Sequence, residues 1–312
     1  MLVYIIECYN KLSIFLKVVI INMKKILKIT AAFMIVIVLF ITTEIIISYK
    51  CLTISHYKIK SDKIKNNTRI ILLSDLHNNE FGKENQRLVS KIKAQKPDLI
   101  LLDGDILNEE GKDEKIATYL VKRLKKIAPV YYSLGNHELG YMKAGRSDLL
   151  NQLKAAGAQV LDKNYKDINI NQNKIRIGGL YEYAFAVDDK GNMSKEKMKP
   201  VVRKFLTQFE DTDHFKIMMS HRPDSFIFGY ATDTWKIDLV ASGHAHGGQV
   251  RFPFKGGLYG ADQGWFPKYV DGIHHFDKVK NLIITRGLGS DKEKLPRFHN
   301  IPEIVVIDLT SK

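Results

Sequence analysis

Residues 70–77 read IILLSDLH, an apolar run that ends in a short polar island. A run of aliphatic and β-branched residues predicts a strand buried on both faces, as in the core of a parallel sheet. The polar residues then fall at the carboxyl end of the strand, where open α/β sheets place their ligand sites. Because Asp75 and His77 are two positions apart, both side chains can point to the same side while Leu76 packs inward.

The same pattern, an apolar run followed by a polar island, occurs four more times along the chain. The runs are DLILLD before Gly104, VYYSL before Gly135, FKIMM before Ser220 and DLVAS before Gly243. The islands that follow contain Asp105, Asn136, His137, His221, His244 and His246. Taken singly, each island is more typical of a turn, a helix cap or a structural histidine. Five islands in one order, each at a predicted strand end, indicate one shared site.

The residue types in these islands are those that bind divalent cations. Carboxylate, amide and imidazole donors suit first-row metals. The carboxylate of Asp105 has two oxygens and can bridge two cations about 3.5–4 Å apart. Asn136 offers a neutral amide oxygen, and the turn from His244 to His246 can direct two imidazoles to adjacent cations. Asp103 should face the opposite way and is not expected to be a ligand.

The series DLH, GD, GNHE, SH and GHAH resembles the calcineurin-like metallophosphoesterase superfamily, with similarity from about residue 69 to 309. The stretches GHAHGGQVRFPFKGGLYG and RGLGSDKEKLPRFHNIPEIVVIDL further resemble its membrane-anchored bacterial phosphodiesterase-like branch. The resemblance implies a four-layer α/β/β/α sandwich, whereas the periodicity alone predicts only an α/β fold. Ala245 stands where relatives often have Thr, and this position is not expected to ligate.

The resemblance also implies two divalent metal ions (Mn²⁺, Fe or Zn²⁺) and a role for each island. One metal would be held by Asp75, His77, Asp105 and His246, and the other by Asp105, Asn136, His221 and His244. A metal hydroxide would attack phosphorus in line, and His137 would protonate the leaving oxygen as general acid. Glu138 or another acid would orient His137.

These features predict a phosphodiesterase or pyrophosphatase that acts on a membrane-associated or nucleotide-linked substrate, for example a lipid-linked one. Two alternatives stay open: a phosphomonoesterase, and a non-catalytic membrane scaffold on a retained hydrolase fold. The physiological substrate, the metal identity and the oligomeric state are not determined by the sequence.

Ahead of the catalytic region lies an apolar stretch, residues 29–49, whose only charge is Glu44. Its length suits a helix that spans a bilayer, and a basic start at Met23 without a small-x-small cleavage site favours an uncleaved signal anchor. We expect a basic segment over 1–28, in which 1–22 reads as an over-extended start, then a transmembrane signal anchor over 29–49. A linker over 50–65 and a catalytic domain over 66–312 should follow. The predicted location is the cell membrane, single-pass, with the catalytic domain outside the cytoplasm.

Charge and cysteine content narrow the class of protein. The formal net charge is +14, but ten lysines against three acidic residues in 1–65 account for about half of it. Clustered Arg and Lys with interleaved aromatic residues are not found, so specific nucleic-acid binding is not expected. Cys8 and Cys51 both precede the catalytic region, so neither a disulfide framework nor a cysteine metal site is predicted there.

Between the islands, helical and strand-like patterns alternate, which favours one α/β domain. Helices are expected around residues 84–94, 114–127, 147–156 and 194–209, and a hairpin over 167–177 with its turn at 171–173. Late strands are expected at 281–286 and 303–309.

Overall fold

The computed structural model describes residues 1–146, 148–290 and 295–312, and the chain divides into two units, Met1–Ile46 and Ile47–Lys312. The first unit belongs to helix α1, Leu2–Lys50, the one described helix that is long and apolar enough to cross a membrane. The basic segment and the apolar stretch of the sequence are thus parts of one continuous helix. Its length and composition are compatible with a signal anchor or a signal sequence.

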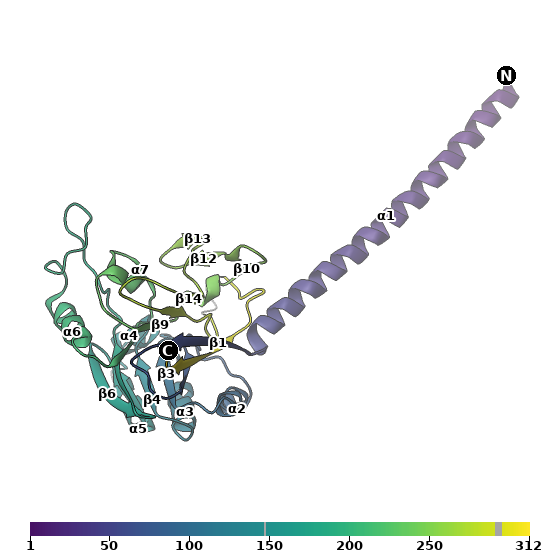
Figure 1. Ribbon diagram of the computed structural model, residues 1–312. Helices are drawn as coiled ribbons and strands as arrows, with labels where there is room; N and C mark the ends of the chain where they lie inside the picture. The colour runs from purple at the N-terminus through teal and green to yellow at the C-terminus, as the bar shows by residue number, and fades with distance from the viewer. Residues whose placement is uncertain (147, 291–294) are drawn as a thin grey trace. The chain divides into compact units, whose positions relative to one another are not determined.

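The second unit contains two six-stranded mixed sheets (Figure 1). The first sheet has the order β1-β16-β2-β3-β4-β5, with β2 to β5 parallel and β16 antiparallel to β2. The second has the order β14-β15-β9-β8-β7-β6, with β15 to β7 parallel and both edge strands antiparallel. The strands are β1 Thr53–Lys60, β2 Thr68–Leu73, β3 Leu99–Asp103, β4 Val130–Ser133, β5 Ala158–Leu161, β6 Asn164–Ile170, β7 Asn173–Gly179, β8 Phe215–Met219, β9 Leu239–Ser242, β14 Gly272–His274, β15 Leu282–Ile284 and β16 Glu303–Thr310.

The four predicted helices are present with shifted ends, as α2, α3, α5 and α6, and the sequence did not predict α4 and α7. The helices are α2 Gln86–Ala94, α3 Lys115–Leu124, α4 Asn136–Lys143, α5 Leu149–Ala156, α6 Pro200–Glu210 and α7 Asp224–Ile227, with 3₁₀ turns at Lys83–Asn85, Ala231–Asp233 and His246–Gly248. Helix α6 begins later than expected because Pro200 forces the residue before it out of the helical region, and Lys199 has ψ 126°. Ser147, the expected start of α5, lies outside the described residues.

Three hydrophobic clusters fill the spaces between the layers. Successive strand residues point to opposite faces, so Ile70 packs between the sheets while Ile71 packs under α2, α3 and α5. The third cluster lies between the second sheet and α6, around the buried Trp235. This is the predicted α/β/β/α sandwich, and its three clusters lie within residues 52–309. The second unit therefore carries a hydrophobic core of its own.

The expected linker over residues 50–65 is wrong in its middle part. Residues 53–60 form β1, which pairs in parallel with β16 along its whole length. The sequence TISHYKIK alternates, so that Tyr57 and Ile59 turn inward while Lys58 and Lys60 remain exposed. The alternation is the signal for an edge strand, and the lysines on its outer face disguise it.

A second region without a sequence prediction follows the last polar island. Strand β10, Arg251–Phe252, pairs with β11, Gly256–Gly257, and β12, Tyr259–Gly260, pairs with β13, Gly264–Trp265. These two short hairpins are grouped at one end of the second unit (Figure 1). Two-residue strands rich in glycine leave no periodic signal, which is why the sequence did not indicate them.

Candidate metal centre

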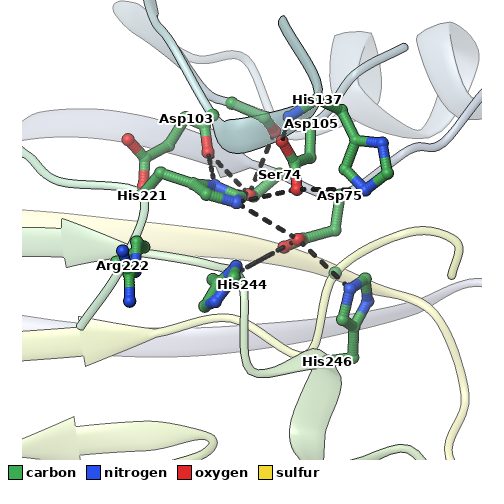
Figure 2. A network of polar contacts seen from close by, with 12 residues as sticks. Ser74, Asp75, Asp103, Asp105, His137, His221, Arg222, His244 and His246 are labelled. Carbon is green, nitrogen blue, oxygen red and sulfur yellow. Dashed lines mark hydrogen bonds and ion pairs between the residues drawn. The ribbon is translucent and has the colours of Figure 1, made fainter. Parts of the chain in front are cut away.

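The polar islands of both sheets meet at one place, as their positions after the strands predict. The first sheet supplies Asp75 and His77 after β2, Asp105 after β3, and Asn136 and His137 at the start of α4, whereas the second supplies His221 after β8 and His244 and His246 after β9. Figure 2 shows the carboxylates of Asp75 and Asp105 facing the rings of His221 and His246.

Short distances connect these side chains across the two sheets. The Nε2 atom of His221 lies 3.0 Å from Oδ2 of Asp105 and 3.8 Å from Oδ1 of Asp75. The Nε2 atom of His246 lies 3.6 Å from the same Asp75 oxygen. His77 Nε2 is 3.9 Å from a carboxylate oxygen of both Asp75 and Asp105. The donor atoms fall into three overlapping groups, each compact enough to surround a cation.

Four of these donor atoms are buried and, apart from the 3.0 Å contact between His221 and Asp105, have no hydrogen-bond partner among the described residues. They are Nε2 of His77, Oδ2 of Asp105, Oδ1 of Asn136 and Nε2 of His221. Buried polar atoms are normally paired, and an unpaired one requires an explanation. Since all four point into one space and belong to types that ligate metals, this set of residues fits divalent cations.

The other ring nitrogen of three histidines is fixed by an oxygen acceptor. Nδ1 of His221 lies 2.7 Å from the carbonyl oxygen of Asp103, and Nδ1 of His246 lies 3.2 Å from that of Gly289. Nδ1 of His77 lies 2.8 Å from the amide oxygen of Asn108. Each Nδ1–H therefore donates, which directs Nε2 at the site, where a cation can take the place of an Nε2 proton. This is the arrangement that orients metal-binding imidazoles in proteins.

The backbone is strained at the same positions. Asp75, His77, Asp105, His244 and His246 all have φ between 48° and 62°, a region that non-glycine residues rarely adopt. Such strain clusters at functional sites, where the surrounding structure maintains it. Gly135 shows how tight the packing is, because a Cβ atom there would lie 2.1 Å from Oδ1 of Asp105.

Burial and the neighbouring imidazoles shift the pKa values of the two carboxylates in opposite directions. Burial raises the pKa of Asp105, but His221, His77 and His137 outweigh it and hold that pKa well below its usual range. The same balance lowers the pKa of Asp75, through His246 and His221. Both carboxylates are thus ionised, which gives the site the negative charge that attracts cations.

Asp103, which is not expected from the sequence to be a ligand, is buried beside the site. Its pKa shifts in the opposite direction from those of Asp75 and Asp105. Burial raises its pKa well above the usual range. Its two carboxyl oxygens have no hydrogen-bond partner among the described residues. Its backbone carbonyl, in contrast, accepts the hydrogen bonds of His221 and of the Ser74 hydroxyl, both at 2.7 Å. The residue acts here through its backbone.

Glu138 does not orient His137, contrary to the sequence expectation. Its buried carboxylate accepts hydrogen bonds from the backbone N–H groups of Asp105 at 2.8 Å, Ile106 at 2.9 Å and Gly135 at 2.8 Å. It also accepts one from the Tyr132 hydroxyl at 2.6 Å. Glu138 therefore ties the loops after β3 and β4 together, because it satisfies N–H groups from both.

His137 is oriented by backbone instead. Its Nδ1 accepts a hydrogen bond from the N–H of Glu109 at 3.2 Å, so the ring proton resides on Nε2. That Nε2 lies 4.0 Å from Oδ2 of Asp105, and the His137 backbone N–H donates to Oδ1 of the same residue at 2.9 Å. A donor nitrogen therefore borders the space between the candidate ligands.

The sequence did not single out a second layer of residues around His244. Nε2 of His244 lies 3.2 Å from Oδ2 of Asp262, which comes from the loop between β12 and β13. Asp262 also accepts two hydrogen bonds from Arg222, at 2.7 and 3.1 Å, and Arg222 donates to the Tyr183 hydroxyl. The sequence could have indicated Arg222, because it directly follows the candidate ligand His221. No sequence signal indicates Asp262, because it approaches His244 only in the folded chain.

A cavity of about 450 Å³ opens next to the candidate ligands. Its polar wall includes Asp105, Asn136, His137, His244 and His246, and its apolar wall includes Ala245, Tyr259, Ala261, Trp265 and Leu295. The cavity thus offers a polar surface for a phosphate group and an apolar surface for whatever is attached to it.

Comparison with known proteins gives a consistent result. The family model for calcineurin-like phosphoesterases matches residues 68–248, which include all seven candidate ligands and His137. The chain is 27% identical over 252 residues to metallophosphoesterase Cj0846 of Campylobacter jejuni, covering 80% of this chain and 61% of that protein. It therefore spans less than two thirds of that relative. It is also 27% identical to metallophosphoesterase YkuE of Bacillus subtilis (78% of this chain, 79% of YkuE) and to phosphodiesterase YaeI of Escherichia coli (77% and 82%).

Proposed function

We propose that this chain, which belongs to the calcineurin-like phosphoesterase family, is a metal-dependent phosphoesterase that cleaves phosphodiesters or pyrophosphates of membrane-associated or nucleotide-linked substrates. The observation that carries the proposal is the set of unpaired buried donor atoms beside a cavity that continues along an apolar wall. A diester or pyrophosphate has a second substituent on phosphorus, and this wall gives that substituent a place. The name of the similar YaeI protein, phosphodiesterase, supports the same choice.

We assign one metal to Asp75, His77, Asp105 and His246, and the other to Asp105, Asn136, His221 and His244, with Asp105 as the bridge. In support, His77 Nε2 and His246 Nε2 both lie within 4 Å of Oδ1 of Asp75, and His221 Nε2 lies 3.0 Å from Oδ2 of Asp105. Two divalent cations bound here would supply a water of lowered pKa and neutralise charge on the phosphoryl oxygens.

His137 is the general acid in this proposal. The hydrogen bond from Glu109 keeps the proton on Nε2, the nitrogen on the side of Asp105. To donate that proton to the leaving oxygen as the ester bond breaks, the ring must be the imidazolium, in which Nδ1 has taken up a second proton in place of the Glu109 hydrogen bond; the ring then ends as neutral imidazole, and the role is worth about 10²–10⁴-fold in rate. Burial of the ring restricts its motion and keeps the donor in place.

We further propose that the apolar part of α1 is a signal anchor and that the catalytic domain lies outside the cytoplasm. An uninterrupted apolar helix next to basic residues supports the first point. Protease treatment of intact cells tests the second. Cleavage of the catalytic domain without lysis is the expected result, and protection until lysis would reverse the orientation.

The proposed reaction is tested with the purified chain, bis-p-nitrophenyl phosphate and p-nitrophenyl phosphate. With Mn²⁺ present, the diester should be hydrolysed faster than the monoester, and a chelator should abolish both activities. A preference for the monoester would make the protein a phosphomonoesterase. Hydrolysis of neither, with metal bound, would favour a scaffold that has lost catalysis.

A further inference from the structure

The two short hairpins beside the metal centre carry an unusual surface. Within residues 251–266, Phe254 is fully exposed, and Trp265, Phe266 and Phe252 are 67%, 55% and 42% exposed. Among the other described residues of the second unit, the one Phe or Trp that is comparably exposed is Phe228. We call residues 251–266 the aromatic hairpins. Their large apolar rings face water instead of the core, and such contiguous patches mark interaction sites.

The arrangement of the rings has no visible role in folding. Phe254 occupies the tip of the β10–β11 hairpin, in a turn with φ 67° that favours glycine or asparagine over a large side chain. The rings of Phe252 and Phe266 lie 6.4 Å apart at their centres, on neighbouring hairpins, so the patch is continuous between them. A bulky apolar residue at a strained, exposed tip indicates a function outside the folded chain.

The charge on this surface is positive. Lys255 and Lys268 are exposed, and Lys255 Nζ lies 5.7 Å from the centre of the Phe266 ring. The two carboxylates within residues 251–271 are both neutralised, Asp262 by Arg222 and Asp271 by Arg251. Exposed aromatic rings next to an exposed lysine match the interface of an anionic lipid bilayer, where rings insert between headgroups and lysines contact phosphates.

The surface continues into the catalytic cavity. Trp265 belongs to the patch and also lines the cavity, as His137 and His246 do, and Tyr259 contacts it edge-on at 5.4 Å. Trp265 thus connects the exposed patch with the cavity of the candidate ligands.

We propose that the aromatic hairpins dock the catalytic domain onto an anionic bilayer and admit an amphiphilic phosphoester from it. The phosphoester meets the metal centre while its apolar part lies along Trp265 and Tyr259. The same chain carries a helix long and apolar enough to cross a membrane, so a bilayer is an available partner. The substrate part of this inference rests on the proposed function, whereas the docking does not.

Tryptophan fluorescence of the full chain tests the docking directly. The chain has two tryptophans, and Trp235 is fully buried with its N–H donating to the carbonyl oxygen of Ala184 at 2.7 Å. We reconstitute the full chain in vesicles of phosphatidylglycerol and phosphatidylcholine, with and without bromine on the acyl chains. The emission due to Trp265 is the difference between wild type and Trp265→Phe. Bromine should quench it and leave that of Trp235 unchanged; equal Trp265 emission in both vesicles would overturn the proposal.

Two variants sharpen the result. Phe254→Asn removes one inserting ring at a tip whose φ suits asparagine, and should lower the ratio of docked to undocked chains roughly tenfold. Lys255→Gln should lower it roughly fivefold with anionic lipid and leave it unchanged with neutral lipid. The control Tyr119→Ala removes an exposed ring from α3 and should change nothing. If Phe254→Asn instead dissociates a dimer in detergent and leaves quenching intact, the surface binds a second copy and the proposal fails.

Activity separates the docking from the proposed function. Phe254→Asn should hydrolyse soluble bis-p-nitrophenyl phosphate at the wild-type rate and an anionic lipid phosphodiester in vesicles about tenfold more slowly. No hydrolysis of either substrate by wild type, with quenching intact, would refute the proposed function and leave the docking in place. Hydrolysis of the soluble diester without quenching of Trp265 would refute the docking and leave the proposed function in place.

Discussion

The two sheets contribute different chemistry to one site. The first supplies both ionised carboxylates, Asp75 and Asp105, together with the amide of Asn136 and one imidazole, His77, whereas the second supplies only imidazoles, those of His221, His244 and His246. The negative charge that attracts cations therefore comes from one side, and the other side adds neutral ligands that complete their coordination. Removing the shared carboxylate of Asp105 from the first sheet should weaken binding of both cations, whereas disturbing a ligand from the second sheet should weaken binding of one cation.

Asp105→Asn should have the largest effect. The amide preserves the size of the side chain but removes the charge between the two halves, so both metals should be lost and diester hydrolysis should fall roughly a thousandfold. Elemental analysis and initial rates measure the two losses. Asp103→Asn is the matched control, two positions away and equally buried, at a carboxyl whose pKa burial raises well above its usual range. It should retain both metals, and two tightly held ions in Asp105→Asn would refute the bridging role.

His137→Ala should separate metal binding from proton donation within the first sheet. We expect wild-type metal content and a loss of roughly a hundredfold in kcat for a diester with an alkyl leaving group. The loss should be smaller with p-nitrophenolate, which leaves without protonation. His275→Ala, which removes an exposed histidine, serves as the control. If metal content and rate fall together, His137 is structural.

Metal removal should lower the free energy of unfolding, because the metal centre lies between the two sheets. Because the cations would relieve the repulsion between buried carboxylates, a hundredfold excess of Mn²⁺ over its Kd should add about 2.7 kcal/mol per bound cation to the free energy of unfolding. That corresponds to a rise of roughly 5 °C in Tm, measured by calorimetry with and without chelator. The rise should vanish in Asp105→Asn, and an equal Tm with and without metal would contradict a cation between the sheets.

Asp262→Asn should have the smallest effect and be confined to the second sheet's side. Asp262 faces Nε2 of His244, so its loss should weaken one metal roughly tenfold and spare the other. Titration calorimetry with Mn²⁺ resolves the two affinities. Asp271→Asn, which removes the partner of Arg251 on the same region of the chain, is the control. Equal weakening of both metals would show that Asp262 acts on the whole site.

The sequence predicts the site better than its surroundings, for a physical reason. Asp75, Asp105 and His221 follow long apolar runs, and a buried parallel strand fixes where its end lies. The oxygen acceptors that orient the buried imidazole rings belong to Asn108, Gly289 and other residues that are distant in the sequence. No local sequence pattern therefore indicates them.

The features that the sequence does not predict have related physical causes. The sequence predicts a linker where β1 lies, because this edge strand carries lysines on its outer face. The aromatic hairpins have strands of two residues. Asp262 lies 18 positions after His244 in the sequence, and no periodic pattern between them indicates that they come close. In each case the missing information lies in contacts between distant residues.

The most direct test of the central claim, one dinuclear centre shared by both sheets, is electron paramagnetic resonance of the Mn²⁺-loaded chain. Two Mn²⁺ ions bridged by Asp105 should give the multiline spectrum of an exchange-coupled pair at two equivalents, and Asp105→Asn should abolish it. A six-line spectrum of isolated Mn²⁺ at every loading would contradict the shared centre.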